Sequence, residues 1–328
     1  MKEKEIAHLI ATMQKNANKA SRQCLYNGCN EAAIISHLLQ KRGILNSISE
    51  QQHVYENSLH AFKKDFFAFN RIGLAEALSY PGFCNKHDTE LFKDIESGAL
   101  DYKAYKTHLL LSYRALMIEK RKKEINIDWY NRILNAKTLA PHLDNGFIME
   151  IHESIKGEKE GMQDQQHYER FFLSNIEDET LRDFKFVYFE LPRIEVCSAA
   201  VFTYETSEEI ALMNLFQKDK INDPLTEIYF HLLPLVDKSI VIMGCLNKNI
   251  DKCWSYIQSY SEGDEKHRLK KVSDLLICQV ENWVCSPSFY ISNCKRREAE
   301  INSLVRLSMK HPNERRELEF NLFEAYNK

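Results

Sequence analysis

The sequence predicts an α+β protein, with a mainly helical N-terminal part and a C-terminal part in which helices pack on an antiparallel sheet. Three observations indicate this class. Apolar residues recur at helical spacing in the first half, they alternate with period two in residues 184–205 and 225–246, and helical spacing returns from residue 264. Strands that are followed by helices favour an antiparallel sheet with packed helices.

The first half contains two clear helical patterns. Residues 1–22 form an amphipathic pattern, and residues 101–124 form another, with Asp101 as the expected N-cap. The second pattern ends in the basic run EKRKKE, which we interpret as a solvated helix end or as a phosphate-contacting patch.

A polar stretch with two glycines, residues 154–166, has the composition of a flexible connection. We place a domain boundary there and expect one domain over residues 1–155 and a second over 165–328.

The C-terminal domain begins with four predicted strands. Residues 184–205 read as two strands broken at Pro192, and residues 225–246 as two more, broken between Pro234 and Lys238. Amphipathic helices follow over residues 264–283 and 295–311, and Pro312 stops the last one.

Composition limits the possible classes of protein. With 44% hydrophobic residues and a formal net charge of −3, the chain has no global basic field to attract nucleic acid or an anionic membrane. The most apolar run, residues 239–246, is much shorter than the roughly 20 residues that span a bilayer. The N-terminus does not have the pattern of a signal peptide. We therefore expect a cytoplasmic protein that does not associate with membranes.

Nine cysteines in a chain without an export signal indicate a reducing compartment, where clustered cysteines hold metal more often than they form disulfides. Six of them are scattered singly over the second half, and we interpret these as small buried hydrophobic residues. They are Cys197, Cys245, Cys253, Cys278, Cys285 and Cys294.

The other three cysteines lie in two short motifs, CLYNGC at residues 24–29 and CNKH at residues 84–87. Zinc prefers four tetrahedral ligands from thiolate and imidazole, and pairs at this spacing let one tight turn present two of them. The Asn-Gly interior of the first motif tolerates the backbone angles of such a turn. The sequence therefore predicts a structural Zn²⁺ held by Cys24, Cys29, Cys84 and His87. Two unrelated coincidental pairs are the alternative.

His37 is a fifth candidate ligand, eight residues after Cys29. Three interpretations are open for it. It acts in catalysis or contacts substrate, it is a hydrogen-bonded core residue, or it completes the zinc site in place of His87.

The order of a first motif, an intervening chain, a second motif and then a helix with Asp88 or Thr89 at its start resembles a treble-clef zinc finger over residues 24–96. Within that group the region resembles HNH endonucleases. The resemblance implies that His37 is the general base and that Asp88, with help from Asn46 or His53, holds a catalytic Mg²⁺ or Mn²⁺. Ser36 departs from the family pattern, which has a carboxylate or histidine before the base.

The sequence leads to two hypotheses from different classes. The first is a zinc-stabilised, HNH-like protein that processes DNA or RNA, a metal-dependent nuclease. A wider resemblance to uncharacterised bacterial proteins implies a role in defence against phage or plasmids. The second is a non-enzymatic, zinc-stapled module that binds protein or nucleic acid, with a protein partner on the C-terminal domain. Motifs of P-loop, dinucleotide, zinc-protease and α/β-hydrolase enzymes are absent from the sequence.

Overall fold

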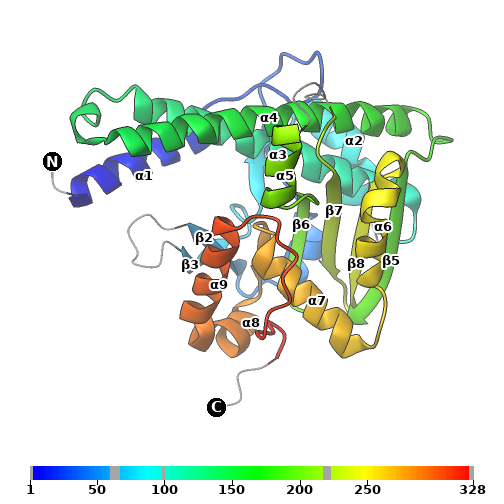
Figure 1. The fold of residues 1–328 in the computed structure, drawn as a ribbon. Coiled ribbons are helices and arrows are strands. Elements are labelled where there is room, and N and C mark those ends of the chain that lie inside the picture. Colours follow the sequence, from blue (N-terminus) through cyan, green and yellow to red (C-terminus); the bar gives the residue numbers. More distant parts are fainter. Residues whose placement is uncertain (1–2, 60–66, 98–99, 217–222, 325–328) are drawn as a thin grey trace.

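The structure is a computed structural model, and it describes residues 3–59, 67–97, 100–216 and 223–324. Figure 1 shows the fold. Its strands are β1 (Ile35–His37), β2 (His53–Leu59), β3 (Phe67–Gly73), β4 (Ser79–Pro81), β5 (Phe184–Pro192), β6 (Val196–Thr203), β7 (Glu227–Pro234), β8 (Lys238–Leu246) and β9 (Trp283–Cys285).

The helices include two long ones, each of 30 residues or more. They are α1 (Glu3–Lys19), α2 (Asn85–Glu96), α3 (Tyr105–Leu134), α4 (Asn145–Glu177), α5 (Ser207–Phe216), α6 (Ile250–Ser259), α7 (Glu265–Cys278), α8 (Pro287–Phe289) and α9 (Glu298–Lys310). Short 3₁₀ or π turns occupy Lys41–Leu45, Ala140–His142, Asn247–Asn249, Tyr290–Cys294 and Lys295–Arg297.

The α+β prediction is confirmed. Seven strands form one antiparallel sheet in the order β3-β2-β9-β6-β7-β8-β5, and β1 pairs separately with β4. The four strands expected in the C-terminal part are β5 to β8, with breaks after Pro192 and Pro234 as predicted. The predicted helices at 264–283 and 295–311 correspond to α7 and α9. The expected extent of the first is wrong, because α7 ends at Cys278 and Trp283 begins β9, where it pairs with β6.

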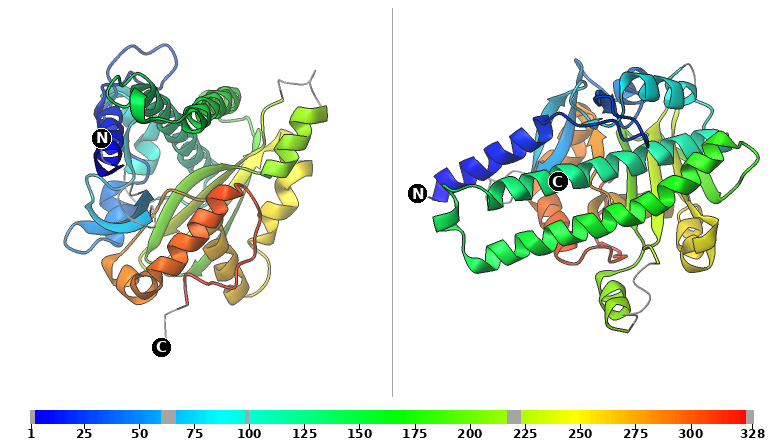
Figure 2. Two further views of the ribbon diagram at one scale, coloured as in Figure 1. Left: turned by 60° about the vertical axis from the view of Figure 1, so that its left-hand side comes forward. Right: turned by 90° about the horizontal axis from the view of Figure 1, so that it is seen from above.

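The sheet is covered on both faces, which makes three layers (Figure 2). Alternate side chains of β7 show this: Tyr229 and Leu233 pack in the core beneath α3 and α4, while Phe230 packs in the core formed with α6, α7 and α9. A strand buried on both faces loses the polar alternation of a half-exposed strand. This is why residues 228–233 are apolar apart from His231.

One hairpin joins the N-terminal half of the chain to this sheet. β2 pairs with β3 and also with β9, and β9 pairs in turn with β6. The core beneath α3 likewise includes residues from both halves, such as Leu45, Phe92 and Tyr229. The division into domains 1–155 and 165–328 stays a prediction, and one sheet and one core run across it.

The expected flexible connection at residues 154–166 is wrong, because these residues lie inside α4. The two glycines of that stretch, Gly157 and Gly161, are helical. α4 packs along α3, and tertiary packing of this kind outweighs the low intrinsic helix propensity of glycine. At their far ends the two helices meet α1 in a small apolar cluster around Ile133, Leu139 and Ile151.

α3 is the central helix, and its residues 107–118 are all buried. Two expectations about it are wrong. The helix begins at Tyr105 with Ala104, not Asp101, at the N-cap position, and it continues past the basic run to Leu134. Asp101 instead accepts a hydrogen bond from the backbone N–H of Lys103.

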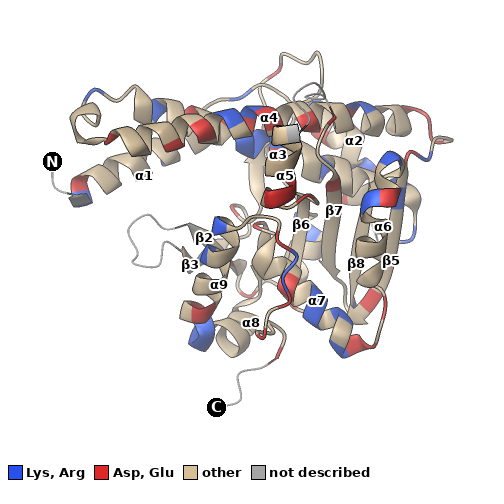
Figure 3. Cartoon of the chain, viewed as in Figure 1, with Lys and Arg blue, Asp and Glu red and all other residues tan. Residues whose placement is uncertain are grey.

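The basic run therefore lies in the middle of α3, and it is neither a helix end nor a free cationic patch. Its lysines form ion pairs with acidic residues of neighbouring elements. Lys120 contacts Glu169 at 2.7 Å, and Lys123 contacts Glu158 at 3.5 Å. Figure 3 shows acidic and basic residues interspersed along α3 and α4.

Candidate metal centre and adjoining cavity

The first motif forms a tight turn held by backbone hydrogen bonds. Cys24 N–H donates to the carbonyl of Glu31 at 2.8 Å, and Cys29 N–H donates to that of Tyr26 at 3.0 Å. Gly28 has a φ of +75°, a conformation that glycine adopts without steric cost. The turn places both thiols on one side of the loop.

The second motif forms the start of α2. Cys84 is the N-cap residue, and His87 and Asp88 lie in the first turn of the helix. The helix begins before the expected N-cap, Asp88 or Thr89. Leu25 N–H donates to the carbonyl of Gly82 at 3.0 Å, which ties the two motifs together.

The four predicted ligands come together in one cluster. Their sulfur and nitrogen atoms all lie within 4.8 Å of one another. His87 Nδ1 lies 3.4 Å from Cys24 Sγ and 3.3 Å from Cys84 Sγ, and the sulfurs of Cys29 and Cys84 are 3.9 Å apart. A zinc tetrahedron with bonds of about 2.3 Å to sulfur and about 2.0 Å to nitrogen has edges of about 3.5 to 3.8 Å. The cluster could therefore hold a metal ion of this size.

The surroundings hold these side chains in place. The Tyr26 ring stacks on the His87 imidazole with ring centroids 4.1 Å apart, and Tyr26 N–H donates to Cys24 Sγ at 3.4 Å. The N–H of His87 at the start of α2 lowers the pKa of the Cys84 thiol, whereas burial raises the pKa of Cys24 to about 11. All nine cysteines lie in the described part of the chain, and they are free.

His37 lies outside this cluster, at the end of β1. Its Nε2 is 2.8 Å from the carbonyl oxygen of Leu74. A carbonyl only accepts, so Nε2 carries the proton and Nδ1 is the basic nitrogen of the neutral ring. Burial lowers the pKa of His37, which favours this neutral form.

His37 and Asp88 line the same cavity. It has a volume of about 340 Å³ and lies between β1 and the outer face of α2, where Asp88 directly follows His87 of the Cys/His cluster. Buried polar oxygens are present here. Ser36 Oγ and Asp88 Oδ1 make no hydrogen bond with any residue that the structure describes. The cavity wall also contains Lys41, Lys93 and Glu96.

Other residues considered from the sequence do not line this cavity. Asn46 accepts a hydrogen bond from Gln52, and the ring of His53 contacts the carbonyl of Gln51 at 2.7 Å. The help expected for Asp88 from Asn46 or His53 is therefore not present in this structure.

Lys41 and Lys93 also line the cavity, and the sequence motifs did not indicate either of them as a site residue. Neither ammonium group has an ion-pair partner within residues 3–59, 67–97, 100–216 and 223–324. A signal for Lys93 was available, because Thr89, Lys93 and Glu96 share one face of a helix by their spacing. Lys41 follows β1 by only a few residues, but sequence spacing does not show the direction in which the chain turns.

Comparisons with protein-family models, with curated proteins and with solved structures find no match to this chain. Fold and site together define an α+β protein with a Cys₃His cluster that could hold a metal ion. The treble-clef and HNH assignments stay predictions. Among the helices that the structure describes, none has both the length and the apolar composition needed to cross a bilayer.

Proposed function

We propose that this protein is a zinc-stabilised, HNH-like nucleic-acid-processing protein, a metal-dependent endonuclease with His37 as general base and Asp88 as ligand of a catalytic Mg²⁺ or Mn²⁺. One observation carries the proposal: the two residues, 51 positions apart in the sequence, line one cavity beside the Cys₃His cluster.

Zinc is the metal that suits the cluster best. Three thiolates and one imidazole are soft or borderline ligands, and a four-ligand tetrahedral set without an open position is typical of structural zinc. The cluster joins the loop at residues 24–29 to the start of α2, and α2 provides Asp88 to the cavity. Zinc would therefore hold the cavity in shape and take no part in the reaction.

His37 has the properties of a general base. Its orientation by the Leu74 carbonyl leaves Nδ1 as the acceptor, and burial keeps the ring neutral near pH 7. In phosphodiester hydrolysis this nitrogen would take the proton of the attacking water.

Asp88 and Ser36 supply oxygen atoms of the kind that bind hard divalent cations. When bound, such a cation supplies positive charge that stabilises the phosphate in the transition state. Lys41 and Lys93, on two sides of the same cavity, would bind phosphate groups of the nucleic acid.

The test is cleavage of plasmid DNA and of RNA with Mg²⁺ or Mn²⁺. We expect cleavage by the wild type, loss of cleavage in His37→Ala and in Asp88→Asn, and unchanged zinc content in both variants. His152→Ala, an exposed histidine on α4, is the matched control and should cleave normally. Full activity of His37→Ala would refute the role of this residue. Loss of zinc in the same variant would make it a metal ligand.

A second, non-catalytic function is favoured by the small number of free carboxylates in the cavity. Glu96 forms an ion pair with the buried Arg114 at 2.5 Å, which leaves Asp88 as the carboxylate free to bind a cation there. Ser36, a neutral hydroxyl, stands where the HNH pattern has a carboxylate or histidine. The alternative is therefore a non-enzymatic, zinc-stapled module that binds protein or nucleic acid. Stable binding without cleavage of any nucleic acid, or a stoichiometric co-purifying protein, would support it.

The role in bacterial defence rests on the resemblance in sequence. Plating of phage on cells that express the wild type or His37→Ala tests it. Protection by the wild type alone would support defence by cleavage.

A further inference from the structure

A second cavity, of about 390 Å³, lies between the middle of α3, the middle of α4 and the ends of β6 and β7. It is separate from the cavity of His37 and shares no lining residue with it. Its volume is in the range of pockets that hold small organic molecules. The proposed function makes no use of it.

Most acidic residues in the wall of this cavity are paired. Lys122 contacts Glu119 at 3.0 Å and Glu281 at 3.2 Å, and Glu160 has Lys156 at 4.0 Å. Lys123, also in the wall, pairs with Glu119 at 3.8 Å and with Glu158 at 3.5 Å. Both lysines of the wall are therefore already paired with acids.

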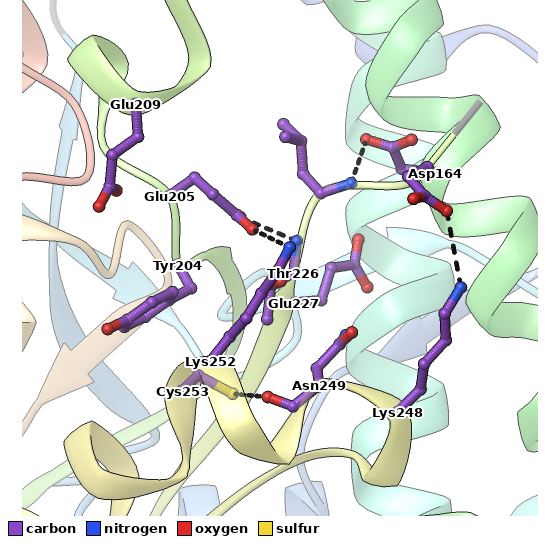
Figure 4. Close-up of polar contacts among 12 residues, drawn as sticks. Asp164, Tyr204, Glu205, Glu209, Thr226, Glu227, Lys248, Asn249, Lys252 and Cys253 are labelled. Atoms are coloured by element: carbon purple, nitrogen blue, oxygen red, sulfur yellow. Dashed lines mark hydrogen bonds and ion pairs between the residues drawn. The ribbon is translucent and has the colours of Figure 1, made fainter. Parts of the chain in front are cut away.

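Asp164 and Glu227 differ from these residues. Asp164 accepts from the backbone N–H of Leu225 at 3.4 Å, and Glu227 accepts from the Tyr229 hydroxyl at 3.3 Å. Neither has a basic partner within 4.0 Å in the part of the chain that the structure describes. Figure 4 shows the contrast with Glu205. Its carboxylate accepts a hydrogen bond from Thr226 N–H and forms an ion pair with Lys252.

Glu227 is only 6% exposed, so its carboxylate is removed from water without a basic group in direct contact. Lys123, in the same wall, acts on it only from a greater distance and lowers its pKa less than burial raises it. Burial and the nearby Asp164 raise the pKa of Glu227 to about 8, and burial raises the pKa of Asp164 to about 6. Ionisation of both groups on one wall is costly unless a cation binds near them.

A third acceptor in the same wall is without a donor. Gln165 is 2% exposed, and its Oε1 makes no hydrogen bond with the described residues. Part of the remaining wall is apolar and includes Phe202 and Leu225, and the rest is polar. Buried acceptors that lack donors, next to an apolar wall, indicate a ligand that carries N–H donors and methylene groups.

We propose that this cavity binds a small organic cation, an alkylammonium or alkylguanidinium compound, with Asp164 and Glu227 as the acceptors of its charged group. A divalent metal fits less well. In the described ranges, the Cys₃His group is the one set of three or more His, Cys, Asp or Glu side chains that brings its ligand atoms together.

The experiment uses the full-length protein with putrescine and agmatine as probes, and measures binding by calorimetry and by thermal shift. We expect saturable binding of one or both compounds. Glu227→Gln and Asp164→Asn should each weaken it by about tenfold or more, the equivalent of one lost charge pair. Glu153→Gln, an exposed acid on α4 outside the cavity, should bind like the wild type.

A second readout separates binding from a merely structural role. Glu227→Gln removes an uncompensated buried acid, so the variant without ligand should be at least as thermally stable as the wild type. Binding should also release protons into a weakly buffered solution, because the acids ionise when the cation enters. Absence of saturable binding at millimolar probe, equal affinity in Glu227→Gln, or displacement of the probes by Mg²⁺ or Ca²⁺ at comparable concentration would overturn the proposal.

Discussion

His37 Nε2 lies 2.8 Å from the carbonyl oxygen of Leu74, and this contact decides which ring nitrogen is basic. β1 places the ring, and the chain just after β3 places the carbonyl. The hydrogen bond partly opposes the effect of burial, and burial is the larger influence, so the pKa of His37 lies below its usual value of 6.5.

The pH dependence of cleavage follows from that pKa. A general base must be unprotonated, so the rate should rise with pH through the region below 6.5 and be level from there to neutral pH. The measurement is a pH–rate profile of the wild type at saturating Mn²⁺. A rate that first rises well above pH 7 would contradict the assignment of His37 as the base.

Removal of one ligand of the cluster should release the metal. We expect the wild type to carry one zinc ion. Cys84→Ser should lose this ion and about 4 kcal/mol or more of unfolding free energy, because loss of a metal is among the most destabilising changes. Elemental analysis and urea unfolding measure the two effects. Cys278→Ser, a partly buried cysteine outside the cluster, should keep its metal. Equal metal content in all three proteins would refute the site.

Acid should destabilise the protein partly through His231. This residue on β7 is fully buried, its Nε2 is 3.1 Å from Ser112 Oγ, and burial lowers its pKa to about 3. The folded state binds this proton more weakly than the unfolded state, so the contribution is fully present above pH 6.5 and is lost between 6.5 and about 3. Its slope is up to about 1.4 kcal/mol per pH unit.

The measurement is the free energy of unfolding of the wild type and of His231→Leu at several pH values from 6 to 4. As the pH falls, the wild type should lose more unfolding free energy than His231→Leu, because only the wild type has this group to protonate. His267→Leu, an exposed histidine on α7, should follow the slope of the wild type. Parallel curves for wild type and His231→Leu would show that the ring does not titrate in this way.

Phe172 tests whether the chain unfolds as one unit. Its ring on α4 is fully buried, stacks on Phe184 with centroids 4.0 Å apart and meets Tyr229 edge-on. Phe172→Ala should cost about 3–5 kcal/mol and shift a single urea transition. Met149→Ala, whose side chain is 68% exposed on α4, should leave the transition in place. Two transitions, of which only one moves, would instead support separate domains at 1–155 and 165–328.

The sequence by itself determined the α+β class, the strands β5 to β8 and the Cys/His motifs. These features are local: period-two alternation, proline breaks and short ligand spacings are readable within a few residues. The helical state of residues 154–166 was not readable, because packing of α4 on α3 overrides the propensity of its glycines.

Only the tertiary structure decided which histidine joins the cysteines. The Cys-x2-His spacing favoured His87, and His37 stayed open as the alternative ligand. The start of α2 brings His87 Nδ1 to 3.3 Å from Cys84 Sγ, while β1 turns His37 toward Leu74. The tertiary structure also joined β2 and β3 to the C-terminal sheet through β9, and it brought Asp164 and Glu227 into the wall of one cavity. Contacts between distant segments depend on how whole elements pack, and no pattern confined to one stretch of sequence contains that information.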